Sequence, residues 1–184
     1  KERRIEKFSF VILILHHYLK DRMDIPVIVI RRGKEESILR RHPWIFSGAV
    51  FSDTETISEG QVVRVMDSNN RFLCLGHFQP STIAVRILTF EDRPVDTEFY
   101  IEKLKNAFEL RKSLGLFAEH NTIFRVVHGE GDGLPGLVVD FYNGVAVIQC
   151  HSIGMYHAID SIVEGLKAGF GEHLKAVYHK SSET

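Results

Sequence analysis

The sequence predicts an α+β protein in which a small β-barrel precedes a domain that mixes helices and strands. Two observations lead to this fold class. Between residues 23 and 95, short β-branched segments are separated by brief turns, which is typical of a small barrel. From residue 96 to 184, helical and extended patterns follow one another as helix, strand, hairpin, helix and strand. The charged stretch 91–96, which contains Pro94, marks the expected boundary.

Five strands are expected in the first domain. The third and fourth are separated by Asp67-Ser68-Asn69-Asn70, and Asp and Asn favour turns because their side chains bond the nearby backbone and tolerate positive φ. We therefore predict that these two strands form a hairpin. The expected strands are 25–30, 45–51, 61–66, 72–78 and 82–88.

In the second domain, local signals mark the ends of the elements. Asp96 or Thr97 can cap the first helix, and Gly115 and Gly171 can end the two helices. Asn143-Gly144 between two apolar runs predicts a hairpin, because a type I′ turn needs positive φ at both positions. The expected elements are a helix at 98–114, a strand at 122–127, a glycine-dense loop at 129–136, strands at 137–142 and 145–150, a helix from about 155, and a strand at 174–178.

Residues 1–22 do not continue this pattern. An apolar run at 8–15 follows four basic residues, but it is too short to span a bilayer and has no small-residue cleavage site. Met23 comes directly before the first strand pattern. We therefore expect Met23 to be the natural start and 1–22 to be a non-native extension, with a partly ordered extra helix as the alternative.

Charge is balanced overall but uneven along the chain. The net charge is -1, with 44% hydrophobic and 26% charged residues, as in an ordinary globular protein. From Arg31 to Arg41 there are five basic and two acidic residues, whereas 96–184 holds eight basic and twelve acidic ones. This local basic patch suits docking on phosphate. A solvated loop whose charges have no function is the alternative.

No catalytic, cofactor-binding or metal-ligating residue is predicted. The ten histidines are scattered without a metal-binding spacing, and Cys74 and Cys150 each lie in an apolar run that favours burial. The glycine-dense loop has a GxGxxG-like spacing, but Pro135 lies inside it and a hairpin follows, where a nucleotide-binding fold would have a helix. The loop is therefore interpreted as a structural turn, and its acids Glu130 and Asp132 as capping or solvated groups.

The segment 42–48 is the most informative candidate for binding. It holds the only Trp, a Pro and two further aromatic side chains, directly after the basic patch. Basic and aromatic groups together can pair with phosphates and stack on bases. We expect Trp44 and Phe46 to belong to the core. The predicted RNA-binding residues are Arg32, Lys34, Arg40, Arg41, His42, His77 and Arg86, the last pointing outward between Val85 and Ile87.

Three segments resemble bacterial class I SAM-dependent 23S rRNA (cytosine-C5) methyltransferases. Residues 41–50 (RHPWIFSGAV) and 75–88 (LGHFQPSTIAVRIL) resemble the PUA domain of that family, and 124–140 (FRVVHGEGDGLPGLVVD) resembles its central domain. Phe141 departs from the pattern, because the family usually has a basic residue there. Without a basic residue there, the hairpin of strands 137–142 and 145–150 is not expected to bind phosphate through this position.

The resemblance, which covers about 25–184, implies a PUA-like RNA-binding barrel at 23–95 and a central α+β domain at 96–184. It also implies rRNA as partner, a cytoplasmic location, and a third, Rossmann-like domain that binds S-adenosylmethionine and carries the nucleophilic cysteine. None of that domain is present, and the chain stops directly after a strand pattern. We therefore expect a piece truncated before the catalytic domain, inactive alone and without bound cofactor, membrane or metal.

Two other readings stay open. One is a stand-alone PUA-type RNA-binding or ribosome-assembly module without enzymatic activity, which the coding sequence beyond Thr184 would distinguish. The other is a small-molecule enzyme that uses the loop 130–140, although no base, metal and nucleophile occur together there. The sequence leaves the methylated nucleotide and the oligomeric state open.

Overall fold

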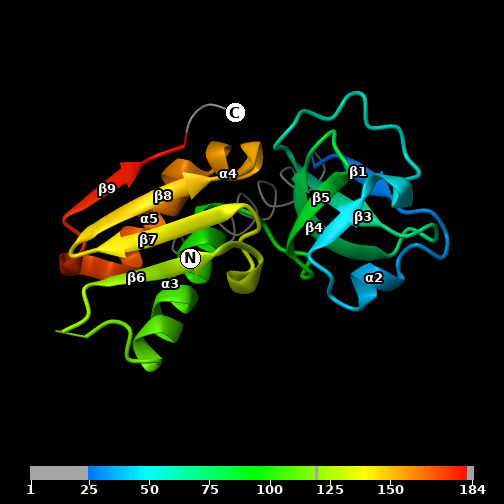
Figure 1. The fold of residues 1–184 in the computed structure, drawn as a ribbon. Coiled ribbons are helices and arrows are strands. Elements are labelled where there is room, and N and C mark those ends of the chain that lie inside the picture. The colour runs from blue at the N-terminus through cyan, green and yellow to red at the C-terminus, as the bar shows by residue number, and fades with distance from the viewer. Residues whose placement is uncertain (1–24, 119, 182–184) are drawn as a thin grey trace, which may run out of the picture.

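The computed structural model describes residues 25–118 and 120–181, so the expectations for residues 1–22 and for Met23 lie outside the described residues. A curled sheet forms the N-terminal half, and a second sheet with helices forms the C-terminal half (Figure 1). The predicted α+β class, with a barrel-like sheet followed by mixed helices and strands, is confirmed.

The first sheet is built around three consecutive antiparallel strands. To these the chain adds one parallel strand on one edge and one antiparallel strand on the other. In spatial order the strands are β1 (Val27–Val29), β3 (Val62–Met66), β4 (Phe72–Phe78), β5 (Ile83–Thr89) and β2 (Trp44–Phe46).

The two edges of this sheet meet and close it into a barrel. Ile30 and Val50 form an isolated antiparallel bridge, the Phe51 amide donates to the Val29 carbonyl at 2.8 Å, and the Arg31 amide donates to the Ala49 carbonyl at 2.8 Å. Closure turns alternate side chains inward, and the barrel core consists of buried aliphatic residues such as Ile28, Val63 and Val85. The outer side chains are thereby left for contacts beyond the barrel.

Two local features of the barrel differ from the expectations. The strand expected at 45–51 is shorter, because after Phe46 the chain turns into a 3-10 helix, η1 (Ser47–Ala49), whose Ser47 amide donates to the Thr82 carbonyl at 2.9 Å. A short helix, α2 (Glu36–Leu39), was not expected at all. It buries Ile38 and presents the rest of the basic segment to solvent.

The second domain places helices on one face of a four-stranded sheet. Its helices α3 and α5 pack together behind the strands, as Figure 1 shows. In spatial order the strands are β6 (Ile123–His128), β7 (Leu137–Tyr142), β8 (Val145–Cys150) and β9 (Ala176–His179), and the helices are α3 (Thr97–Ser113), α4 (Ile153–His157) and α5 (Ile159–Phe170).

The capping and turn signals of this domain act as predicted. The Asp96 carboxylate accepts a hydrogen bond from the Phe99 amide at 3.0 Å and begins α3. Asn143 and Gly144 have φ values of 45° and 99°, as a type I′ hairpin requires. The second helix is interrupted instead of continuous: α4 ends before Ala158 and α5 starts after it, so the short α4 takes its own direction.

Within the described part of the chain, none of the helices combines the length and the apolar character needed to cross a membrane.

Candidate nucleic-acid interface

A row of aromatic side chains lies on the outer face of the edge strand β2. Trp44 and Phe46 flank the buried Ile45, so both point away from the barrel core. With His42 they form a trio whose ring centroids are 5.9 to 6.4 Å apart, and Phe46 is 47% exposed. The prediction that Trp44 and Phe46 belong to the core is therefore wrong, because alternation along β2 turns Ile45 into the barrel core and both of its neighbours outward.

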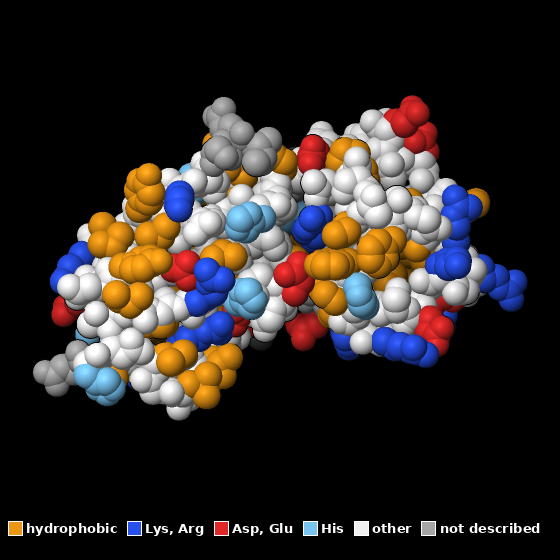
Figure 2. Space-filling model, viewed as in Figure 1, with side chains coloured by type: hydrophobic (Ala, Val, Ile, Leu, Met, Phe, Trp, Pro, Cys, Tyr) orange, Lys and Arg blue, Asp and Glu red, His pale blue; other side chains and the backbone are white. Residues whose placement is uncertain are grey.

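An exposed basic segment comes directly before this aromatic trio in the chain. Arg32 and Lys34 are exposed in the turn after β1, and Arg40 is exposed while paired with Glu36 on α2. Arg41 has a φ of 65°, and its guanidinium lies 4.4 Å from the centroid of the Phe90 ring. Figure 2 shows the hydrophobic patch on this half of the molecule, with Lys and Arg side chains toward its outer end.

Arg86 extends the same surface toward the second domain. Its strand position lies opposite Trp44 on β2 and opposite His77 on β4, so the three residues share one face of the sheet. Arg86 is half-buried, and its guanidinium donates to the Gln79 side-chain oxygen. It therefore points outward, as expected, but toward the junction between the domains.

His77 lies inside that junction. It is 4% exposed, its Nε2 is 3.4 Å from the Tyr100 hydroxyl on α3, and its ring packs directly on Gly154 of α4. Burial, together with the charges of His157 and Arg86, lowers the pKa of His77 to about 4. A neutral imidazole enclosed in this way has no surface to offer RNA, so its burial does not support the expectation for His77.

A hydrogen bond links the aromatic trio to the other domain. The Trp44 indole nitrogen donates to the Glu130 carboxylate at 2.8 Å. Glu130 lies in the 3-10 turn η2 (Gly129–Asp132) that begins the glycine-dense loop. The two domains therefore present one continuous surface, in which the loop holds the barrel's aromatic strand in place.

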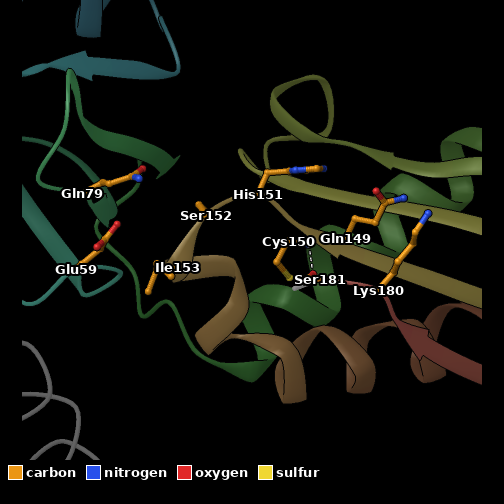
Figure 3. A pocket seen from close by; sticks show the side chains of 9 residues that line it. All are labelled: Glu59, Gln79, Gln149, Cys150, His151, Ser152, Ile153, Lys180 and Ser181. Carbon is orange, nitrogen blue, oxygen red and sulfur yellow. Dashed lines mark hydrogen bonds between the residues drawn. The ribbon is translucent and has the colours of Figure 1, made fainter. Parts of the chain in front are cut away.

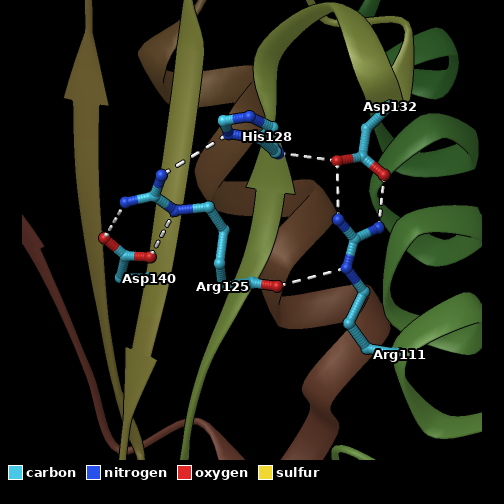
Figure 4. A network of polar contacts seen from close by, with 5 residues as sticks. All are labelled: Arg111, Arg125, His128, Asp132 and Asp140. Atoms are coloured by element: carbon cyan, nitrogen blue, oxygen red, sulfur yellow. Dashed lines mark hydrogen bonds and ion pairs between the residues drawn. The ribbon is translucent and has the colours of Figure 1, made fainter. Parts of the chain in front are cut away.

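Ion pairs fix this loop to the second domain (Figure 4). Arg111 of α3 binds both carboxylate oxygens of Asp132, and Asp132 also accepts from the His128 amide at 2.6 Å. Arg125 makes a bidentate pair with Asp140 on the neighbouring strand, at 2.8 and 3.0 Å. Asp132 is thus engaged in holding the loop, in agreement with its interpretation as a structural turn.

A polar cleft opens where the two domains meet (Figure 3). Its volume is about 480 Å³. Glu59 and Gln79 border it from the barrel, and Gln149, His151, Lys180 and Ser181 border it from the second domain. Because these side chains come from four distant segments, the cleft could not be predicted from the sequence.

Side chains that could do chemistry are sparse. Among the described residues there is no cluster of three or more His, Cys, Asp or Glu that could hold a metal ion. Both cysteines are buried, as expected, and burial raises the pKa of the Cys74 and Cys150 thiols. Protonated, enclosed thiols are poor nucleophiles.

Both domains of this chain resemble parts of known proteins. Residues 28–90 match the PUA-like domain family, so the barrel is a PUA-like domain. The chain is 31% identical over 156 residues to ribosomal RNA large subunit methyltransferase I of Erwinia tasmaniensis, and 34% identical over 147 residues to that of Yersinia pseudotuberculosis. These alignments cover 84% and 79% of this chain, but only 39% and 37% of the relatives.

Solved structures share the fold. A candidate SAM-dependent methyltransferase from Streptococcus mutans superposes with a TM-score of 0.72 and 17% identity, over 85% of this chain and 41% of that one. A candidate methyltransferase solved in complex with SAH has the same TM-score and identity, over 85% of this chain and 40% of that one. The shared fold therefore spans both domains of this chain and less than half of each neighbour.

Proposed function

We propose, from the homology of this chain to part of the ribosomal RNA large subunit methyltransferase I proteins, that it is the RNA-docking portion of an rRNA methyltransferase. The observation that carries the proposal is the exposed surface of the PUA-like barrel, where the aromatic trio and the basic segment lie side by side. A surface of this kind can contact phosphates and unstacked bases at once.

The division of labour follows from the chemistry. An enzyme that methylates a base atom has to take the base out of its stack and present it to the cofactor. A separate module can supply phosphate contacts and register while another domain reads the target. We assign to this chain the phosphate contacts and the register. We assign to its parent a cytoplasmic location, where ribosomal RNA is found.

The glycine-dense loop does not fit S-adenosylmethionine. The glycine-dense loop leads from β6 through a 3-10 turn into the antiparallel strand β7, whereas nucleotide cofactors lie where a strand leads into a helix. Its Asp132 is already engaged by Arg111. We therefore assign cofactor binding and methyl transfer to a part of the parent protein outside the described residues.

The test is RNA binding by the chain, measured by fluorescence anisotropy with single-stranded RNA at several salt concentrations. Replacing Arg40, Arg41 and His42 with Ala should weaken binding. It should also reduce the slope of log affinity against log salt by about 1.4, since each of the two lost arginine–phosphate contacts accounts for roughly 0.7. Lys105→Ala with Lys112→Ala, on the exposed side of α3, is the matched control and should change neither value.

Two results would count against the proposal. If the triple variant bound RNA as tightly as the unchanged chain, the barrel surface would not be the docking face. If the chain by itself transferred label from S-adenosylmethionine to rRNA, the assignment of the chemistry to another part of the parent would be wrong. A parent gene that ended at Thr184 would favour a stand-alone RNA-binding module.

A further inference from the structure

We propose that the cleft between the two domains binds a single unstacked nucleotide with an amine-bearing base, an inference that rests on the proposed RNA docking and deepens it. Its volume of about 480 Å³ lies within the range of small-ligand sites, which is roughly 300 to 1,000 Å³. The cleft adjoins Arg86, which belongs to the barrel's outer face, so RNA that follows this face reaches it.

The polar groups of the cleft are available to a ligand. Within the described part of the chain, the side chains of Glu59, Gln149, His151 and Lys180 make no hydrogen bond or ion pair with one another or with other residues. By contrast, both carboxylates of the neighbouring glycine-dense loop are engaged, Asp132 by Arg111 and Glu130 by Trp44. The cleft is therefore lined by donors and acceptors that are free to form hydrogen bonds with a ligand.

The sides of the cleft differ in charge. Glu59 and Gln79 lie on the barrel side, and Gln149 and Lys180 lie across from them (Figure 3). The Gln79 side-chain oxygen already accepts from Arg86, which leaves its amide N–H groups to face the cleft. One wall thus offers a carboxylate acceptor beside an amide donor, and the other offers an amide and a cation.

This pattern fits a nucleotide better than a bare phosphate. A carboxylate repels an anion but accepts a hydrogen bond from the exocyclic amine of cytosine, adenine or guanine. Glutamine amides can both donate to and accept from base edges, and the lysine ammonium suits the attached phosphate. The exposed imidazole of His151 at the rim can stack on a splayed base.

The experiment compares two RNA oligomers of equal length and charge, twelve cytidines and twelve uridines, bound to the chain in fluorescence anisotropy. Cytosine carries the amine that Glu59 would accept, whereas uracil carries a carbonyl in its place. The unchanged chain should bind the cytidine oligomer more tightly by about fivefold or more. Glu59→Leu, which removes the acceptor, and Gln149→Leu should each reduce this ratio toward one without changing the salt slope.

The variants at the two charged positions, Glu59 and Lys180, have matched controls. Glu55→Leu changes an exposed carboxylate of the loop that leads to Glu59, and it should leave the ratio as it is. Lys180→Ala should weaken the binding of both oligomers, whereas Lys175→Ala, at the other end of β9, should not. Circular dichroism of every variant excludes a loss of fold as the cause.

The outcomes separate this inference from the proposed function. If both oligomers bind with equal affinity, or if Glu59→Leu and Gln149→Leu keep the preference, the cleft assignment is overturned while RNA docking on the barrel stands. If neither oligomer binds the unchanged chain at any salt concentration, RNA docking fails and the cleft assignment fails with it.

Discussion

Asp132 is the residue on which the glycine-dense loop most depends. Its carboxylate accepts from both Arg111 nitrogens and from the His128 amide, and the paired side chains are only 12% (Arg111) and 4% (Asp132) exposed. Removing one partner of such a pair leaves the other charge enclosed without compensation, which is more costly than losing the pair itself. The hydrogen bonds of Asp132 hold the loop in place. They thereby position Glu130, whose carboxylate accepts from Trp44.

Asp132→Ala is therefore expected to lower the free energy of unfolding by about 3 kcal/mol. Urea denaturation followed by circular dichroism measures the change. Asp140→Ala is the matched control, because its partner Arg125 is 45% exposed, and it should cost less than about 1 kcal/mol. Equal losses in the two variants would contradict the buried character of the Arg111–Asp132 pair.

At the scale of elements, the short helix α4 sets how the two domains meet. Gly154 lies where α4 contacts the barrel, and a Cβ atom there would collide with the His77 ring. His77 is itself enclosed and cannot move outward without opening the junction. Glycine is thus required at this position by the close approach of the neighbouring domain.

Gly154→Ala should destabilise the junction and should change the emission of Trp44, the only tryptophan, which is bonded across it. Gly169→Ala in α5 is a close control, because its added methyl group would meet no atom nearer than 3.8 Å. Since Ala favours a helix over Gly by about 1 kcal/mol, the control should keep or raise the melting temperature. Identical melting curves for both variants would refute the tight contact.

The elements that the sequence predicts well are those with local causes. The Asp96 cap and the Asn143-Gly144 turn depend on residues next to them, and both occur as expected. The break at Ala158 was missed, because the apolar spacing from Met155 through Ile162 suits a continuous helix. The interruption comes from the docking of α4 on the barrel, a tertiary cause that periodicity does not contain.

The candidate site was less accessible to prediction than the fold. The basic segment could be found because its residues are neighbours in sequence. Trp44 and Phe46 were misplaced, because the sequence did not show which of the alternating side chains of β2 face the barrel core. The burial of His77 and the cleft of Glu59, Gln149 and Lys180 arise only when the two domains meet.

At the scale of the whole molecule, His77 makes the junction sensitive to pH. Its pKa in the folded chain is about 4, below its ordinary value of 6.5, because it is buried and lies near His157 and Arg86, with the Tyr100 hydroxyl at its Nε2. Between these two pH values the unfolded chain binds a proton that the folded chain does not. Stability contributed by the neutral ring is therefore full above pH 6.5 and is lost as the pH falls toward 4.

Urea denaturation between pH 7 and pH 4 should show a decrease of about 3 kcal/mol in the free energy of unfolding from this group alone. His77→Gln, which has no titrating ring, should lack that part of the decrease. Trp44 emission should report the opening of the junction over the same pH range. A variant as sensitive to pH as the unchanged chain would show that other groups govern the response.

The closure of the barrel also dictates an order of assembly. Strands β1 and β2 are synthesised first, yet their hydrogen-bonding partners, β3 and β5, come later in the chain. During translation, the pairings of β1 with β3 and of β2 with β5 therefore have to wait for residues 62–89, whereas both partners of the bridge between Ile30 and Val50 are already present. Because these pairings span long stretches of chain, loop-closure entropy slows them. The strand that bears Trp44 and Phe46 is thus exposed on the nascent chain until β5 has left the ribosome.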